Sequence, residues 1–293
     1  MTEVYNPRNK AELAACLPLL EQGAVIAGGC TDLSIRFLKT PLPKQLLNVS
    51  LVSDLKEIYA EGGCLHLGAA ATFTELEETA LPEGFTALTQ AASCVGSKQI
   101  RNLATVGGNI MNASPASDLL PSLFMLGASV EFMKPDGSFH DRPIEDTVIG
   151  SGKTSLAYNE VLTAAKIPTA NANGRFSAFL KLGFRKKVTI SRIGVAMSAR
   201  AKDGRADDVR FYMGAVAPVP VRIREAEQIL LDNEWDEETC EKLTAFLSGM
   251  LNRTVPEAFD RDYKVYAVRG AVDDILRMFP FFRGGEGMAP WAT

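Results

Sequence analysis

Apolar residues recur along the first fifty positions with two different periods. Leu13, Leu17 and Leu20 have the spacing of one helix face. The run Ala24–Ala27 has the length of a buried strand and is ended by Gly28-Gly29. The predicted elements are a helix at 9–22, a strand at 24–27, a resumed apolar pattern at 32–39 and a strand at 45–49. Residues 1–53 are therefore expected to form a small unit of alternating strands and helices.

A second unit follows with its own turn signals. The apolar stretches 58–60 and 65–68 flank Gly62-Gly63 and predict a hairpin. Thr72 and Glu75 have the spacing of a capping box, which predicts a helix beginning after Thr72. Further elements are predicted as helices at 85–94 and 118–125, a strand at 129–133 and a turn at 135–137.

The polar stretch Asn171-Ala172-Asn173-Gly174 predicts a boundary before the last domain. Beyond it the sequence predicts strands at 175–182, 193–201 and 209–217, helices at 222–232, 236–251 and 262–279, and a mobile glycine-rich tail at 284–287. The predicted class is α+β. A first domain is expected at 1–170, with subdomains at about 1–53 and 54–170, and a second domain at 175–293.

Length and composition narrow the class of protein. A chain of 293 residues suggests about two domains, at roughly 150 residues each. With 46% hydrophobic and 23% charged residues, it has the composition of a soluble globular protein. A net charge of −4 gives no general affinity for nucleic acid. No apolar run of about 18 residues predicts a membrane span, and the N-terminus lacks a secretory pattern, so a cytoplasmic protein is expected.

Side chains that commonly bind metals are few and scattered. The five cysteines, at positions 16, 30, 64, 94 and 240, include no C-x-x-C pair, so the usual iron–sulfur and zinc patterns are absent. His66 and His140 are the only histidines, which excludes a three-histidine zinc site. We therefore predict no metal ligand and no catalytic side chain, and expect a bound cofactor to supply the chemistry.

Charge is unevenly distributed in the last third of the chain. Residues 175–205 contain nine Lys or Arg and one Asp, whereas residues 225–241 contain eight acidic residues and no basic one. One interpretation is two solvated faces of a domain. The other is that the basic stretch lines a site for an anion or a partner.

Two glycine pairs suggest a backbone site for phosphate. Gly28-Gly29 follows a predicted strand, and Gly107-Gly108 lies within Thr105–Asn109. Glycine reaches positive φ and lets backbone N–H groups approach a ligand, and successive N–H groups form an anion-binding nest. Two such turns facing each other would hold a pyrophosphate, whereas either alone is more typical of an ordinary turn. Neither matches G-x-G-x-x-G or a P-loop, so a Rossmann fold is not predicted.

Three longer stretches resemble one protein family. They are Ala27-Gly28-Gly29-Cys30-Thr31-Asp32-Leu33, Gln99–Ile110 and Ala113–Pro121. In them the chain resembles the FAD-binding subunits of molybdenum hydroxylases, which include the flavoproteins of xanthine dehydrogenase and carbon monoxide dehydrogenase. The likeness continues at 179–186, at 214–218 with Arg222, and at Asp262-Tyr263-Lys264, so it covers nearly the whole chain in order.

The resemblance implies a two-subdomain FAD-binding domain of the PCMH type, followed by a C-terminal antiparallel sheet with helices. It implies that residues 26–33 wrap the pyrophosphate of a non-covalently bound FAD, and that residues 105–109 approach it from the other side. The FAD contacts that it implies are Ile26, Ala27, Gly28, Gly29, Cys30, Thr31, Asp32, Leu33, Val95, Thr105, Gly107, Gly108, Asn109, Asp118, Leu162, Lys181 and Ile190.

Five of these residues have a second interpretation. Asp118 also suits the N-cap of the helix that follows it. Leu162, implied to meet the adenine end, also suits the core of a strand. Lys181, implied to be a cation beside the flavin, also suits a solvated strand position. Val95 and Ile190, implied to flank the isoalloxazine ring, also suit ordinary core packing.

The resemblance implies an electron relay within a hetero-oligomer. Electrons would pass from a small [2Fe–2S] subunit through FAD to NAD+, while a molybdopterin-binding large subunit hydroxylates the substrate. Molybdopterin and clusters are expected on partner subunits only. Residues 187–193 differ from the acidic version of animal xanthine dehydrogenases, which leaves the electron acceptor open.

Two other functions also stay open at this point. A stand-alone FAD-dependent oxidase or reductase of the same fold would need its own substrate pocket and proton donor. A non-enzymatic interaction module would leave the two glycine pairs unexplained.

Overall fold

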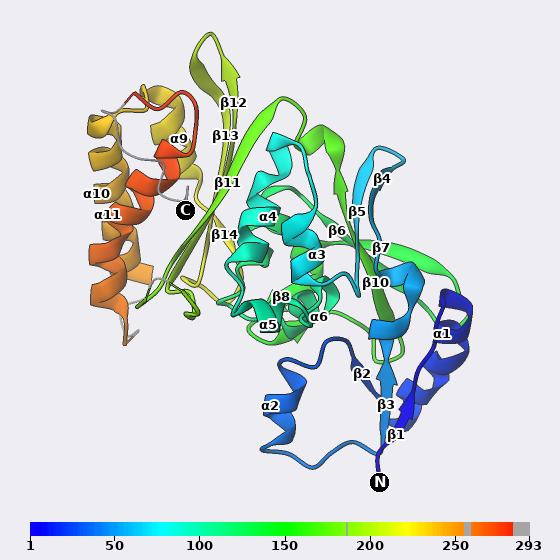
Figure 1. Ribbon diagram of the computed structural model, residues 1–293. Helices are drawn as coiled ribbons and strands as arrows, with labels where there is room; N and C mark the ends of the chain where they lie inside the picture. The colour runs from blue at the N-terminus through cyan, green and yellow to red at the C-terminus, as the bar shows by residue number, and fades with distance from the viewer. Residues whose placement is uncertain (186, 255–258, 284–293) are drawn as a thin grey trace. The chain divides into compact units, whose positions relative to one another are not determined.

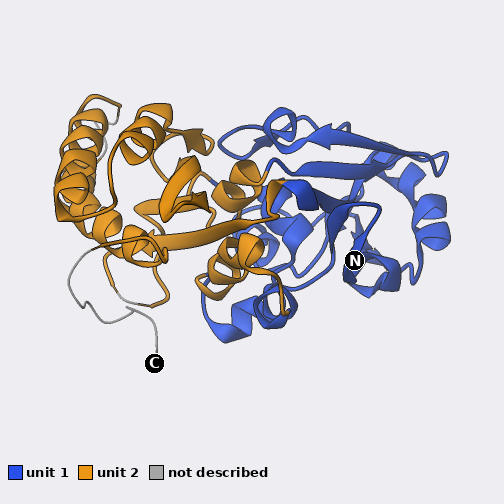
Figure 2. Ribbon diagram, turned by 90° about the horizontal axis from the view of Figure 1, so that it is seen from above, with its two compact units in different colours: residues 1–79, 95–114, 127–170 blue, residues 80–94, 115–126, 171–293 orange. Residues whose placement is uncertain are grey.

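The protein, seen in a computed structural model, is described over residues 1–185, 187–254 and 259–283 (Figure 1). Lys186 and the predicted tail at 284–287 lie outside the described residues. The chain divides into two compact units (Figure 2). Unit 1 comprises Met1–Thr79, Val95–Ser114 and Gly127–Ala170, and unit 2 comprises Ala80–Cys94, Pro115–Leu126 and Asn171–Thr293. The units are therefore not continuous in the sequence.

The N-terminal part of unit 1 alternates strands and helices, as its apolar pattern predicts. Its elements are β1 (Glu3–Tyr5), α1 (Lys10–Cys16), a 3-10 helix (Leu17–Gln22), β2 (Val25–Ala27), α2 (Leu33–Phe37) and β3 (Gln45–Asn48). The strands form a parallel sheet in the order β1-β3-β2. Leu13, Leu17 and Leu47 are fully buried in one core, which explains the helical spacing of the first two.

The second part of unit 1 is a five-stranded antiparallel sheet in the order β4-β5-β10-β6-β7. Its strands are β4 (Ile58–Glu61), β5 (Cys64–Gly68), β6 (Ser129–Met133), β7 (Phe139–Pro143) and β10 (Val161–Pro168). The predicted hairpin is confirmed, because β4 pairs with β5 and both turn glycines, Gly62 and Gly63, have positive φ.

Short elements complete unit 1. They are α3 (Phe73–Glu78), α5 (Lys98–Arg101), α6 (Val106–Asn112), α8 (Ile144–Thr147), β8 (Val148–Gly150) and β9 (Lys153–Thr154). The capping box that begins α3 is confirmed: Thr72 Oγ1 accepts the Glu75 N–H, and the Glu75 carboxylate accepts the Thr72 N–H.

Unit 2 is built on an antiparallel sheet in the order β11-β12-β13-β14. The strands are β11 (Arg175–Leu182), β12 (Ile193–Lys202), β13 (Arg205–Gly214) and β14 (Val221–Arg222). One face is covered by α9 (Arg224–Asp232), α10 (Glu237–Thr254) and α11 (Arg261–Arg277), the other by α4 (Thr86–Ser93) and α7 (Leu119–Met125) (Figure 1). The predicted sheet and its three C-terminal helices are confirmed, as is the α+β class. No described helix is both long and apolar enough to cross a bilayer.

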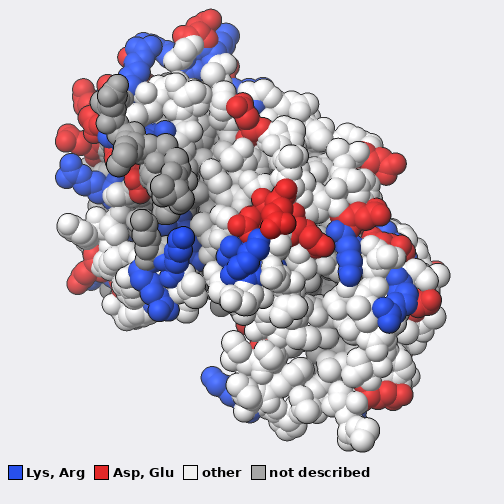
Figure 3. Space-filling model, viewed as in Figure 1, with Lys and Arg blue, Asp and Glu red and all other residues white. Residues whose placement is uncertain are grey.

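The basic stretch at 175–205 is a solvated face only in part: Arg185, Lys187, Arg200, Lys202 and Arg205 are exposed, and the other described basic residues are not. Ion pairs within unit 2 join Arg175 to Asp208, Lys181 to Asp118, Arg192 to Asp260, and Arg205 to Glu234. The side chain of Arg175 is fully buried. The solvated-face interpretation is therefore wrong for Arg175, Lys181 and Arg192, whose charges join elements of this unit. Basic and acidic side chains are also interspersed on the face shown in Figure 3.

Candidate functional site

The first glycine pair lies in a turn of unit 1, residues 28–32, that joins β2 to α2. Neither glycine has a positive φ; that conformation belongs to Cys30, at φ 58°. The expectation that the glycines supply positive φ here is therefore wrong. They are needed for space: a Cβ on Gly29 would overlap the Leu103 carbonyl oxygen, and a Cβ on Gly28 would lie 2.9 Å from Thr105 Oγ1. The structure thus brings the two glycine-bearing segments together, as predicted.

The 28–32 turn has open backbone donors. The N–H groups of Gly29, Cys30, Thr31 and Asp32 make no hydrogen bond to any residue that the structure describes. The turn is closed instead by the Ser34 N–H, which donates to the Cys30 carbonyl oxygen at 2.9 Å. Consecutive free N–H groups around a left-handed residue form an anion-binding concavity. The turn therefore fits a phosphate group.

The second glycine pair belongs to the first turn of α6 and not to a loop. Thr105 is the N-cap, and its Oγ1 accepts the Gly108 N–H at 3.1 Å. The other N–H groups of residues 106–109 donate to the carbonyl oxygens of Ala71, Ala69 and Thr105. The expectation that this segment offers free backbone donors is therefore wrong, because all four are already bonded within unit 1.

Gly107 is needed for close packing against the small-residue run that follows β5. A Cβ on Gly107 would lie 2.8 Å from both the Cβ and the carbonyl oxygen of Ala69. The Ala69 N–H in turn donates to the Thr163 carbonyl oxygen of β10 at 2.9 Å. Sequence reasoning overlooked this run, Gly68-Ala69-Ala70-Ala71, although four successive small residues are a usable sign of close backbone approach.

The other predicted contacts of unit 1 are Leu162 and Val95. Leu162 is buried in β10, next to a β-bulge before Ala164, which fits the strand-core interpretation. Val95 is half-buried, and its carbonyl oxygen accepts a hydrogen bond from Arg101.

Asp118 and Lys181 are bonded to each other in unit 2. Lys181 Nζ donates to Asp118 Oδ2 at 2.7 Å and to the Cys94 carbonyl oxygen at 2.9 Å, and the Ser191 hydroxyl donates to Asp118 Oδ1. Burial raises the pKa of Asp118, although Lys181 and Ser191 act in the opposite direction. Asp118 makes no capping bond, and the Lys181 side chain is only 10% exposed. Asp118 is therefore the N-cap residue of α7 by position, although its side chain bonds elsewhere, and the solvated-lysine interpretation is wrong.

Ile190 lies in the loop between β11 and β12 and is 67% exposed, so the core-packing interpretation is wrong for it. Contacts from the start of α11 fasten both ends of this loop. The Tyr263 hydroxyl donates to the Gly183 carbonyl oxygen at 2.7 Å, and Asp260 pairs with Arg192 at 3.3 Å. Sequence reasoning gave these residues no role, although Asp262-Tyr263-Lys264 was one of the stretches that carried the family resemblance.

Comparison with known families decides the identity of the fold. The family described as "FAD binding domain in molybdopterin dehydrogenase" matches residues 1–170, and the "CO dehydrogenase flavoprotein C-terminal domain" matches residues 178–273. The chain belongs to this flavoprotein family. It is therefore the FAD-binding component of an oxidoreductase, which confirms the resemblance drawn from its three longer stretches.

Individual relatives agree with this assignment. The xanthine dehydrogenase FAD-binding subunit of Escherichia coli O157:H7 is 34% identical over 224 residues, covering 74% of this chain and 76% of the relative. The nicotinate dehydrogenase FAD-subunit of Eubacterium barkeri is 33% identical over 224 residues, covering 74% and 75%. A chain of reconstituted CO dehydrogenase from Oligotropha carboxidovorans superposes with a TM-score of 0.80 at 25% identity, covering 95% of this flavoprotein and 99% of that chain.

Proposed function

We propose that this chain is the electron-transfer subunit of a molybdenum hydroxylase, and that it relays electrons from a [2Fe–2S] partner subunit to NAD+. The observation that carries the proposal is the 28–32 turn, with four consecutive open N–H groups and Gly29 against the Leu103 carbonyl. Hydrogen bonds to a charged group contribute about 1.5–3 kcal/mol each, so these donors suit the pyrophosphate of FAD. When bound, FAD supplies the exchange between single electrons and a hydride.

The predicted contacts remain part of this proposal, with their tasks redistributed. Because the amides of 106–109 are bonded internally, the backbone donors come from the 28–32 turn. Residues 105–109 then let the 28–32 turn pack closely beside α6. Val95 and Leu162 complete the proposed contacts on unit 1. On unit 2 the proposed contacts are Asp118, Lys181 and Ile190. The Lys181 charge there is balanced by Asp118, so it would act on a flavin as half of an ion pair.

The relay also requires partners. We propose a hetero-oligomer in which other subunits hold molybdopterin and the [2Fe–2S] clusters, and in which the substrate meets only the molybdenum subunit. The match of residues 178–273 to a CO dehydrogenase flavoprotein domain supports a relay subunit over a stand-alone oxidase or reductase. All five cysteines are free, which fits the reducing cytoplasm as the place of action.

Gly29→Ala tests the FAD site at the 28–32 turn. The added Cβ would displace the turn from the Leu103 carbonyl, and losing one charge-assisted hydrogen bond is expected to raise the Kd for FAD about tenfold or more. Gly270→Ala on α11 is the control, because an added Cβ there meets nothing within 4 Å. Flavin fluorescence titration of the apoproteins measures both. Wild-type affinity in a folded Gly29→Ala variant would place the pyrophosphate elsewhere.

A further inference from the structure

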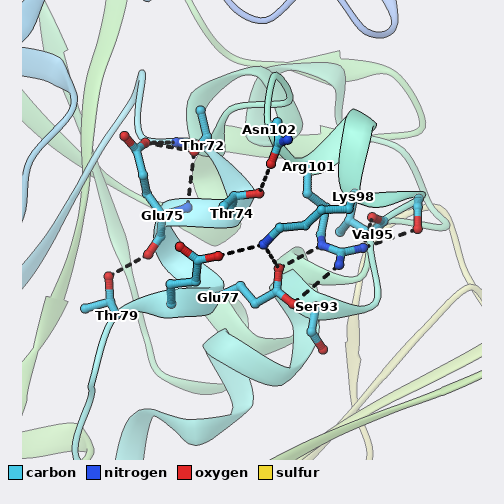
Figure 4. A network of polar contacts seen from close by, with 12 residues as sticks. Thr72, Thr74, Glu75, Glu77, Thr79, Ser93, Val95, Lys98, Arg101 and Asn102 are labelled. Carbon is cyan, nitrogen blue, oxygen red and sulfur yellow. Dashed lines mark hydrogen bonds and ion pairs between the residues drawn. The ribbon is translucent and has the colours of Figure 1, made fainter.

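Arg101, the last residue of α5, joins two parts of unit 1 through one side chain. Its Nη1 donates to the carbonyl oxygens of Val95 at 3.3 Å and Gly96 at 3.5 Å. Its Nε and Nη2 donate to the two carboxylate oxygens of Glu77, at 2.9 and 3.4 Å (Figure 4). The side chain is only 14% exposed. A single planar guanidinium therefore ties the Val95–Gly96 turn to α3.

The Glu77 end of this link is an ionised carboxylate. Partial burial acts to raise the pKa of Glu77, but the hydrogen bonds and charges of Arg101 and Lys98 outweigh it and lower the pKa below its usual value. Lys98 Nζ shares Glu77 Oε2 at 3.2 Å and reaches Glu78 at 2.8 Å. Lys98 differs from Arg101 in two ways: its side chain is 45% exposed, and its ion pairs with Glu77 and Glu78 lie at the surface. Exposed pairs of this kind contribute little to stability.

The segment after Arg101 forms the wall of the 28–32 turn. The Ala104 N–H donates to the Ile100 carbonyl oxygen at 2.7 Å, so residues 103–104 continue directly from α5. The Phe73 N–H donates to the Ala104 carbonyl oxygen at 2.9 Å, which joins the same segment to the start of α3. The Leu103 carbonyl then lies against Gly29. A shift of α5 relative to α3 would therefore move the wall against which the turn is held.

We propose that Arg101 is a positioning residue for FAD. By holding α5 to α3 and fixing the Val95 and Gly96 carbonyls, it keeps Leu103 where the 28–32 turn can present its four N–H groups. It acts through the backbone and not by touching the cofactor. The inference rests on the FAD site proposed above. Lysine cannot replace it, because an ammonium group lacks the planar fork that serves a carboxylate and two carbonyl groups together.

The test compares Arg101→Lys and Arg101→Met with Lys98→Met, which removes a cation from the same carboxylate but leaves the Val95–Gly96 turn bonded. FAD is titrated into each apoprotein at a temperature well below its unfolding midpoint. A general loss of stability then does not change the measured Kd. Both Arg101 variants are expected to raise the Kd at least about tenfold. Lys98→Met is expected to stay within about twofold, since its pairs are exposed.

A second readout is the visible absorption spectrum of the bound flavin. Val95 is a proposed flavin contact, and its own carbonyl oxygen is the one that Arg101 holds. We expect the band to shift in Arg101→Lys and not in Lys98→Met. If Arg101→Met does not fold, Arg101→Lys decides. Wild-type affinity and spectrum in a folded Arg101 variant would overturn the inference. If Gly29→Ala weakens FAD binding and the Arg101 variants do not, only the positioning role fails; if Gly29→Ala binds normally, the site itself is misplaced.

Discussion

Cys30 occupies the one left-handed position of the 28–32 turn, and its side chain is exposed there. The other extreme among the cysteines is Cys240, where burial, with Asp273 and Glu237 adding to it, raises the pKa of the thiol to about 12. A thiol reacts as its thiolate, so Cys240 is protected by both burial and pKa. Burial also raises the pKa of the Cys30 thiol, so exposure is what makes Cys30 the accessible thiol. The chain thus carries an accessible thiol in the proposed phosphate turn and a buried one as an internal standard.

Thiol labelling is therefore expected to report on FAD directly. In the apoprotein near pH 7.5, a maleimide should modify Cys30 ahead of Cys240, with Cys240 unmodified until the protein unfolds. Saturating FAD should slow modification of Cys30 about tenfold or more, because the bound pyrophosphate would cover the turn. Peptide mass spectrometry after timed quenching gives both rates. Equal Cys30 rates with and without FAD would show that the turn stays open when the cofactor binds.

At the scale of single residues, the sequence showed which positions are special but not what each residue does there. Gly29 and Gly107 were singled out for their conformational freedom, yet both are needed for space and neither for positive φ, because only the folded chain shows what lies against them. The bond between Asp118 and Lys181 joins residues 63 positions apart. No local pattern signals such a pair, so each residue was given a separate role.

The loop between β11 and β12 is held at both ends by side chains from the start of α11. It carries the exposed Ile190 and is held at Gly183 by the Tyr263 hydroxyl, while the Tyr263 ring also packs edge-to-face on Phe184. Phenylalanine would keep the ring contact and remove only the hydrogen bond. The Tyr263→Phe variant therefore separates the contribution of the hydrogen bond to Gly183 from that of the ring contact with Phe184.

Tyr263→Phe is expected to loosen this loop without disturbing the sheet beside it. One hydrogen bond contributes about 1 kcal/mol, so amides of the loop should exchange with deuterium about fivefold faster, while those of β12 exchange as in wild type. Tyr266→Phe is the control, because Tyr266 lies on the same helix and is 85% exposed. Peptide-level hydrogen exchange measures both. Unchanged exchange in the loop would mean that the remaining contacts, Arg192 with Asp260 and Ser191 with Asp118, suffice to hold it.

Several elements with a full apolar period were predictable, as was the three-residue β2, but two other very short strands were not. The helices of unit 2 and the β4–β5 hairpin follow local patterns that burial later explains. β1 and β14 have three and two residues, too few to show alternation, and both were missed. α4 and α7 were predicted as helices, but their place in unit 2 depends on packing against strands far along the chain.

At the scale of the whole molecule, the open question is where the electrons go. Unit 1 has the 28–32 turn, which is proposed to bind FAD. Unit 2 has the loop with Ile190, which is a proposed flavin contact. That loop also presents Arg185 and Lys187 as exposed cations. Cations on an exposed loop attract an anionic nucleotide such as NADH, and the attraction is screened by salt over about 8 Å at physiological ionic strength. The acceptor proposal can therefore be tested through charge.

The FAD-loaded protein is expected to be bleached by NADH under anaerobic conditions in a stopped-flow instrument, without hydroxylating any purine. The bleaching rate should fall as salt is added, and the double variant Arg185→Gln/Lys187→Gln should show a lower rate and a weaker salt dependence. Arg224→Gln/Arg269→Gln changes the net charge equally at exposed positions on α9 and α11, and should leave the rate near wild type. A salt effect shared by both double variants would assign it to overall charge. No bleaching at millimolar NADH would mean that the electrons leave for another acceptor, and the NAD+ relay would have to be abandoned while the FAD site stands.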